Sequence, residues 1–250
     1  SNLRKTAKGD AKASIVDCAN HTAVNNYVKE LASSNLCRSV ELFSEIVSAF
    51  LEDQPAALRK FKKEAAAMLA DISDERRNYN EMARQTSYDT KLDQDARYCY
   101  YRACTNMRES SAALVRLARD TQEHVANRHR VYQGPLKHSL LRLVADMQRF
   151  CCGLDASAQL AEVQSYAPKL REKINREQAM LIQLIEPENL SMRGSELYLS
   201  ILLFARDLVN RYELIAMLHS ELDAAVRSAP GAAEEPAWNA TAPRALHAGP

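Results

Sequence analysis

Glycine and proline are scarce in this chain of 250 residues, which contains six glycines and eight prolines. Proteins built from many short strands need turns that are rich in these two residues, so their scarcity argues against an all-β fold. The sequence also lacks any run of 18 apolar residues, which is about the length that a helix needs to span a bilayer. We therefore expect no transmembrane segment in this chain.

A large excess of charge is also missing, because 33 basic residues balance 32 acidic ones and the net charge is +1. This balance argues against a general nucleic-acid binder, since such proteins gain their affinity by neutralising phosphates. The sequence contains no nucleophile elbow, P-loop, zinc-protease motif or glycine-rich phosphate cradle. We therefore expect no enzyme activity and no cofactor.

Cysteine is present without the spacing of a metal or redox site. The six cysteines include no C-x-x-C pair and no zinc-finger pattern. They are Cys18, Cys37, Cys99, Cys104, Cys151 and Cys152. The chain begins at Ser1 without a signal-peptide pattern, so we expect an excised cytoplasmic domain whose thiols are reduced and pack between helices.

Helical periodicity is what the sequence does contain. In the stretch 95–127, small and apolar residues recur three or four positions apart, which places them on one stripe of a helix. They are Ala96, Cys99, Ala103, Met107, Ser110, Leu114, Leu117, Thr121 and Val125. Because most of them are small, we expect neighbouring helices to approach this helix closely.

Similar stripes predict an all-α fold of six amphipathic helices. The predicted helices cover roughly 11–52, 55–85, 95–127, 135–152, 158–185 and 191–228. Each helix must bury its stripe against neighbours, and two three-helix bundles are the simplest arrangement. We expect frayed residues at 1–10, a first bundle at 11–127, a basic connecting loop at 128–134, a second bundle at 135–229 and a disordered tail at 230–250.

A weak internal repeat supports the three-plus-three arrangement. Tyr100 precedes Arg108-Glu109 with the same spacing as Tyr198 precedes Arg206-Asp207. The repeat would make the third and sixth helices equivalents in a duplicated fold.

The order of these segments resembles the PhoU-like domain attached to bacterial inorganic phosphate transporters of the PiT family. The resemblance covers roughly 12–228 and is carried by ELFSEIVSAFLEDQPAALRKFKKEA, ERRNYNEMA, LDQDARYCYYRACTNMRESSAAL, HVANRHRVYQGPLK, INREQAMLIQLI and SELYLSILLFARDLVNRY. It implies two three-helix bundles on the cytoplasmic side of the inner membrane. The implied partner is the membrane domain of the same transporter, with a homodimer as a further possibility.

The resemblance also implies where metal would bind, and the sequence departs from the pattern there. Many PhoU proteins carry E/D-x-x-x-D motifs on the third helix of each repeat, because four-residue spacing stacks two carboxylates on one face. In this chain the corresponding pairs are Arg108 with Ala112, and Arg206 with Asn210. Because arginine cannot ligate a metal ion, we do not expect the metal sites of the family.

The densest basic cluster near a helix break is the best candidate for a contact site. It comprises Arg128, His129, Arg130, Lys137 and His138. These residues could grip an anion, a lipid headgroup or an acidic loop of the transporter, since the fork of arginine suits phosphate and carboxylate. The alternative is that they complement the dipole at a helix C-terminus.

Asp71 and Glu75, four residues apart, are a weaker metal candidate, although Arg76 and Arg77 follow directly and favour a solvated charged face. The sequence and the resemblance together predict a regulatory domain that docks on the membrane part of a phosphate transporter. The alternatives are a free-standing PhoU-like protein of phosphate signalling that binds metal, or a scaffold.

Overall fold

Six long helices make up the part of the chain that the structure, a computed structural model, describes: residues 21–83, 90–129, 131–153, 160–187 and 189–228. The helices are α2 (His21–Leu51), α3 (Pro55–Ala83), α4 (Lys91–Ala126), α5 (Gly134–Gly153), α6 (Leu160–Leu184) and α7 (Met192–Ser228). No strand occurs in these residues. The predicted all-α class is confirmed, and the predicted tails at 1–10 and 230–250 lie outside the described residues.

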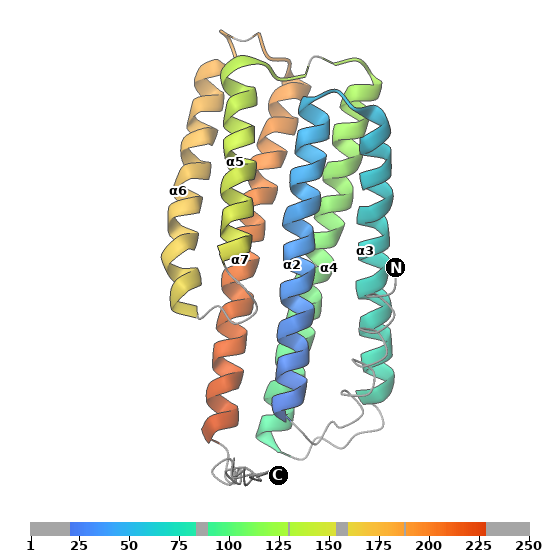
Figure 1. The fold of residues 1–250 in the computed structure, drawn as a ribbon, viewed down its shortest axis with the longest axis vertical. Coiled ribbons are helices and arrows are strands. Elements are labelled where there is room, and N and C mark those ends of the chain that lie inside the picture. The colour runs from blue at the N-terminus through green and yellow to red at the C-terminus, as the bar shows by residue number, and fades with distance from the viewer. Residues whose placement is uncertain (1–20, 84–89, 130, 154–159, 188, 229–250) are drawn as a thin grey trace, which may run out of the picture.

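The helices lie side by side along the long axis of the molecule (Figure 1). The outer helix α3 packs on α2 and α4, and the outer helix α6 packs on α7 and α5. Across the middle, α2 contacts α5 and α7, and α4 contacts α7. Buried residues of all six helices form one continuous apolar cluster. The predicted division into two three-helix bundles at 128–134 stays a prediction, since one core joins both halves.

The predicted apolar stripe of α4 is buried in the core. All nine predicted stripe positions of α4 are buried. Further buried residues lie on other faces of this helix: Tyr100, Cys104, Asn106, Ser111, Ala118 and His124. Because α4 contacts α2, α3 and α7, it buries much more of its circumference than a surface helix does.

Helix α4 begins earlier than the predicted start at residue 95. Thr90 caps it: the side-chain oxygen accepts a hydrogen bond from the Asp93 amide at 3.1 Å, and the Asp93 carboxylate accepts one from the Thr90 amide at 3.0 Å. This reciprocal pair is a capping box, which satisfies two amides that would otherwise lack partners.

Three helix-to-helix connections lie at one end of the bundle, where α2 leads into α3, α4 into α5 and α6 into α7 (Figure 1). We call this end, formed by residues 52–54, 127–129, 131–133 and 189–191, the turn end. No helix in the described residues has both the length and the apolarity needed to cross a membrane.

The three helices that end at the turn end, α2, α4 and α6, have the same type of cap. In each, a non-glycine residue adopts a positive φ: Asp53 at 53°, Arg128 at 55° and Asn189 at 49°. After α4, the amide of His129 donates to the carbonyl of His124 at 3.1 Å, and the amide of Arg128 donates to that of Val125 at 2.9 Å. This pair of bonds is the Schellman motif, which usually places glycine at the positive-φ position.

Candidate functional site

An open cleft of about 530 Å³ lies at the turn end. It is lined by Leu51, Glu52, Asp53, Val125, Arg128, His129, Val131, Gln133 and Lys137. The structure therefore brings together three of the five basic residues that the sequence singled out, Arg128, His129 and Lys137. His138 is exposed on α5 but does not line the cleft, and Arg130 lies outside the described residues.

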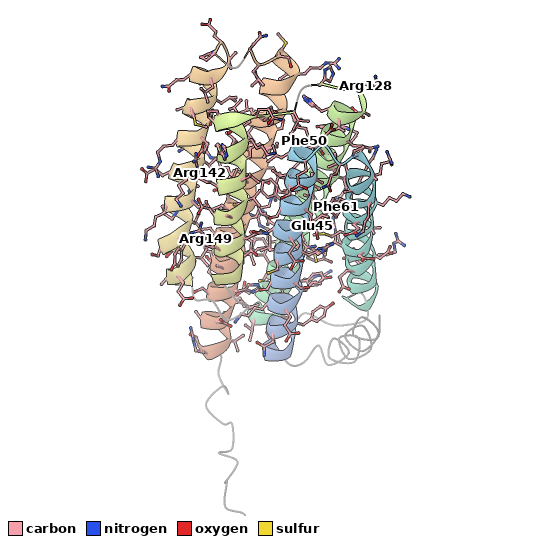
Figure 2. All side chains as sticks on the ribbon, turned by 45° about the horizontal axis from the view of Figure 1, so that its top comes forward. Glu45, Phe50, Phe61, Arg128, Arg142 and Arg149 are labelled. Carbon is pink, nitrogen blue, oxygen red and sulfur yellow. The ribbon has the colours of Figure 1, made fainter. Side chains whose placement is uncertain are left out.

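The cleft is built from chain segments that are distant in the sequence. The C-terminus of α2 supplies Glu52 and Asp53, and the cap of α4 supplies Arg128 and His129. Lys137 comes from the first turn of α5. Figure 2 shows Arg128 near the end of the bundle at which Phe50 of α2 also lies.

Tyr132 fixes the connection that carries the basic residues. It is only 2% exposed, and its ring packs edge-on against Phe50 at 5.3 Å and against Tyr198 at 5.2 Å. Its hydroxyl donates to the carbonyl of Gly194 at 2.6 Å. The connection is therefore anchored to both α2 and α7. Sequence reasoning placed Tyr132 within the basic loop and missed this anchor, because only its partners in the fold reveal it.

The cations of the cleft have few partners of their own. Within the described residues, neither Arg128 nor Lys137 forms a salt bridge, although Glu52 and Asp53 line the same cleft. Nε2 of His129 is shielded from solvent and has no hydrogen-bond partner there, and the His129 ring lies 5.1 Å from that of His124. The cleft thus contains positive charge that the described protein groups do not neutralise directly.

The acidic metal candidates do not converge. Asp71 is exposed, whereas Glu75 is half-buried and accepts a hydrogen bond from the Tyr27 hydroxyl of α2. No group of three or more histidine, cysteine or acidic side chains with metal-binding geometry occurs in the described ranges.

The positions that correspond to the acidic motif of PhoU proteins carry other side chains, which contact solvent. Arg108 and Arg206 are exposed. Asn210 accepts a hydrogen bond from Arg171 at 3.3 Å, and Ala112 is half-buried. These positions therefore present no carboxylate to a cation.

Arg211 is a half-buried cation that sequence reasoning did not single out. It joins α7 to α4, because it donates to Asn106 Oδ1 at 3.0 Å and to Glu109 at 2.8 Å, as well as to Asp207 on its own helix at 2.7 Å. Glu109 and Asp207 are the acidic residues of the internal repeat, so the structure brings the two copies of the repeat to one guanidinium.

The cysteines whose side chains the structure describes are not joined by disulfides. Cys99 and Cys104 are buried on α4, and Cys37 is half-buried on α2. Burial raises the pKa of Cys99 to about 12 and that of Cys104 to about 11. At neutral pH both remain protonated, which suits packing residues and disfavours nucleophiles. The side chains of the other three cysteines lie outside the described residues.

Comparison with known proteins gives a fold relationship. No protein-family model and no curated protein matches the sequence. Among solved structures, the phosphate transport system regulatory protein PhoU from Streptococcus pneumoniae is similar, with a TM-score of 0.52 and 13% sequence identity. The match covers 82% of this chain and 98% of that protein. The chain therefore has a PhoU-like helical fold.

Proposed function

We propose that this bundle regulates an inorganic phosphate transporter by docking on the membrane part of the transporter, at the cytoplasmic side of the inner membrane. The observation that carries the proposal is the fold match, which spans 98% of a phosphate transport system regulatory protein. Regulation of this kind requires that the bundle bind one transport conformation more tightly than another.

The chemistry of the cleft supports contact rather than catalysis. Among the described residues that line it, there is no serine, threonine or cysteine that could act as a nucleophile. The buried thiols of Cys99 and Cys104 lie on α4 and do not line it. The charged side chains and the concave shape of the cleft suit a binding role.

The turn end is the surface that we propose for docking. The two most exposed large apolar side chains of the described residues flank the α6–α7 connection: Met192 at 79% and Ile182 at 68%. Arg128 and Arg193 are exposed at the same end. Exposed apolar residues beside cations are typical of surfaces that meet a partner close to a membrane with anionic lipids.

Photo-crosslinking tests this docking surface. A photoreactive amino acid placed at Met192 in cells should crosslink to the membrane part of a phosphate transporter. Tyr98 is a matched control, because it is 58% exposed and lies near the start of α4, at the opposite end of the bundle. Equal crosslinking from both positions, or none from position 192, would contradict the proposal.

A free-standing PhoU-like regulator is the second candidate, favoured by the near-complete coverage of the matched protein. Such a protein could act as a scaffold, as a homodimer or as a metal binder. Elemental analysis of the purified protein detects bound metal, and sedimentation of the same sample measures the oligomeric state. Together these two measurements distinguish the three forms. Stoichiometric iron or zinc would favour the metal-binding form and would require ligands such as Asp71 and Glu75.

A further inference from the structure

We propose that the cleft at the turn end binds inorganic phosphate, which still carries a proton near neutral pH. The cleft residues that would hold this group are Arg128, His129, Lys137, Glu52 and Asp53. The site stands on the geometry and charges of the cleft, and only the link between phosphate binding and transport regulation rests on the proposed function.

The charged side chains of the cleft favour an anionic ligand. Arg128 and Lys137 have no salt-bridge partner in the described part of the chain, so both retain donors for a ligand. Gln133 and Lys137, from the start of α5, form part of the wall, and a helix N-terminus favours anions. Arginine adds a planar fork that suits a tetrahedral oxyanion.

The backbone of Arg128 adopts a conformation that is unusual for arginine. Three helices end at this face in the same cap, and two of them place asparagine or aspartate at positive φ, residues that tolerate this conformation. Arginine at 55° is less favourable there than glycine, because its Cβ crowds the following carbonyl. A strained residue at a cleft indicates that its side chain has a role there.

Two carboxylates, those of Glu52 and Asp53, lie in the same cleft. Glu52 accepts a hydrogen bond from Gln54 at 2.6 Å, whereas the carboxylate of Asp53 has no donor among the described residues. A carboxylate repels a fully ionised anion but accepts a hydrogen bond from a protonated phosphate oxygen. Sulfate and phosphodiesters carry no such proton near neutral pH. Cations and carboxylates together therefore favour phosphate over these anions.

The same carboxylates argue against an acidic protein segment as the occupant. Aspartate and glutamate side chains of a partner are ionised near neutral pH and have no proton to share with Asp53. Such a segment would face the repulsion of Glu52 and Asp53 without compensation. A protonated phosphate is the ligand that satisfies both kinds of group in the cleft.

Calorimetric titration of the whole chain near neutral pH tests the site. The ligands are inorganic phosphate, glycerol phosphate as a monoester, sulfate, and vesicles of phosphatidylglycerol as a phosphodiester surface. We expect saturable binding of inorganic phosphate, and weaker binding of the monoester, which is largely a proton-free dianion at this pH. Sulfate should bind about tenfold or more weakly than inorganic phosphate. Arg128→Gly, which suits the backbone and should remain folded, should weaken phosphate binding by about tenfold or more.

Two variants serve as matched controls for these changes. Arg149→Gln removes an exposed cation of α5 that pairs with Asp146 at 3.2 Å outside the cleft, and it should leave phosphate affinity unchanged. Asp53→Asn should reduce the difference in binding affinity between phosphate and sulfate. Asp74→Asn, on the exposed face of α3, should leave that difference unchanged.

Several results would overturn the proposal. These are the absence of saturable phosphate binding up to about 10 mM, equal affinity for phosphate and sulfate, or phosphate binding that Arg128→Gly leaves intact. Binding of phosphatidylglycerol vesicles, or of an acidic peptide, without binding of phosphate would assign the cleft to another partner. A failed titration leaves the docking proposal standing, because crosslinking from position 192 tests docking without any ligand.

Discussion

The backbone of Arg128 forms the cap of α4, but this cap does not require an arginine side chain. Its amide completes the cap of α4, while its φ of 55° lies in a region that favours glycine. The sequence identified the residue by charge alone. Its conformation could not be predicted, because arginine is not a usual signal for the end of a helix.

Replacing Arg128 with glycine should therefore stabilise the fold. We expect the free energy of unfolding to rise by about 1 kcal/mol, since the left-handed conformation no longer opposes a Cβ atom. Urea denaturation measures this change. Asn189→Gly, at the same position of the α6 cap, is the control and should change stability less, because asparagine tolerates positive φ. A clear loss of stability in Arg128→Gly would show that the side chain holds the fold.

His219 is a second residue whose surroundings only the fold reveals. It is 9% exposed on α7, and neither ring nitrogen has a hydrogen-bond partner in the described residues. Burial and then the charge of Lys29 from α2 lower its pKa to about 4, and Asp223 opposes this shift. Cys99 of α4 interacts with the same Lys29 and Asp223.

Stability should fall as pH falls from 6.5 to about 4, because the unfolded state then binds a proton that the folded state excludes. The difference between the pKa of His219 in the unfolded and in the folded state corresponds to about 3 kcal/mol in the free energy of unfolding. This contribution is fully lost only below the pKa of the folded state. Urea unfolding across this range, compared with His219→Leu, isolates the effect. His138→Gln, at an exposed histidine of α5, is the control and should follow the wild type. An unchanged pH profile in His219→Leu would refute this assignment.

Among the elements, α4 packs against three other helices, α2, α3 and α7. The sequence identified its main stripe because apolar and small residues recur at helical spacing. It did not identify the further buried faces, since residues such as Asn106 and His124 are polar and give no apolar signal. The start at Thr90 was missed for another reason: the Thr90–Asp93 capping box lies in a stretch that reads as a polar connection.

The contact of α4 with α7 depends on Arg211. Arg211→Met keeps much of the side-chain volume but removes the bonds to Asn106, Glu109 and Asp207. We expect a loss of about 1–3 kcal/mol in the free energy of unfolding, because the side chain is only 15% exposed.

Arg119→Met is the control for this measurement by urea denaturation. Arg119 pairs with the adjacent Asp120 at 3.0 Å and is 50% exposed, so its loss should cost less than about 0.5 kcal/mol. Equal effects of the two substitutions would mean that Arg211 is an ordinary surface cation and that packing alone joins the helices.

At the scale of the whole molecule, the sequence predicted the class and the helix order. Amphipathic stripes require helix neighbours, and short connections restrict which helices can be adjacent. It could not predict the cleft, because Asp53 and Lys137 are 84 positions apart and meet only in the fold. The basic loop was recognisable in the sequence as a cluster of charge. Its proximity to Glu52 and Asp53 was not.

We propose that this bundle adjusts phosphate transport by contact, and a measurement of phosphate uptake in cells tests that proposal most directly. Residues 21–228 would be removed in frame from the gene, and initial uptake of radiolabelled phosphate measured in cells grown with scarce and with plentiful phosphate. We predict that uptake no longer adjusts to supply, and that restoring the residues restores the adjustment. The same rate, apparent affinity and response to supply with and without these residues would contradict the account.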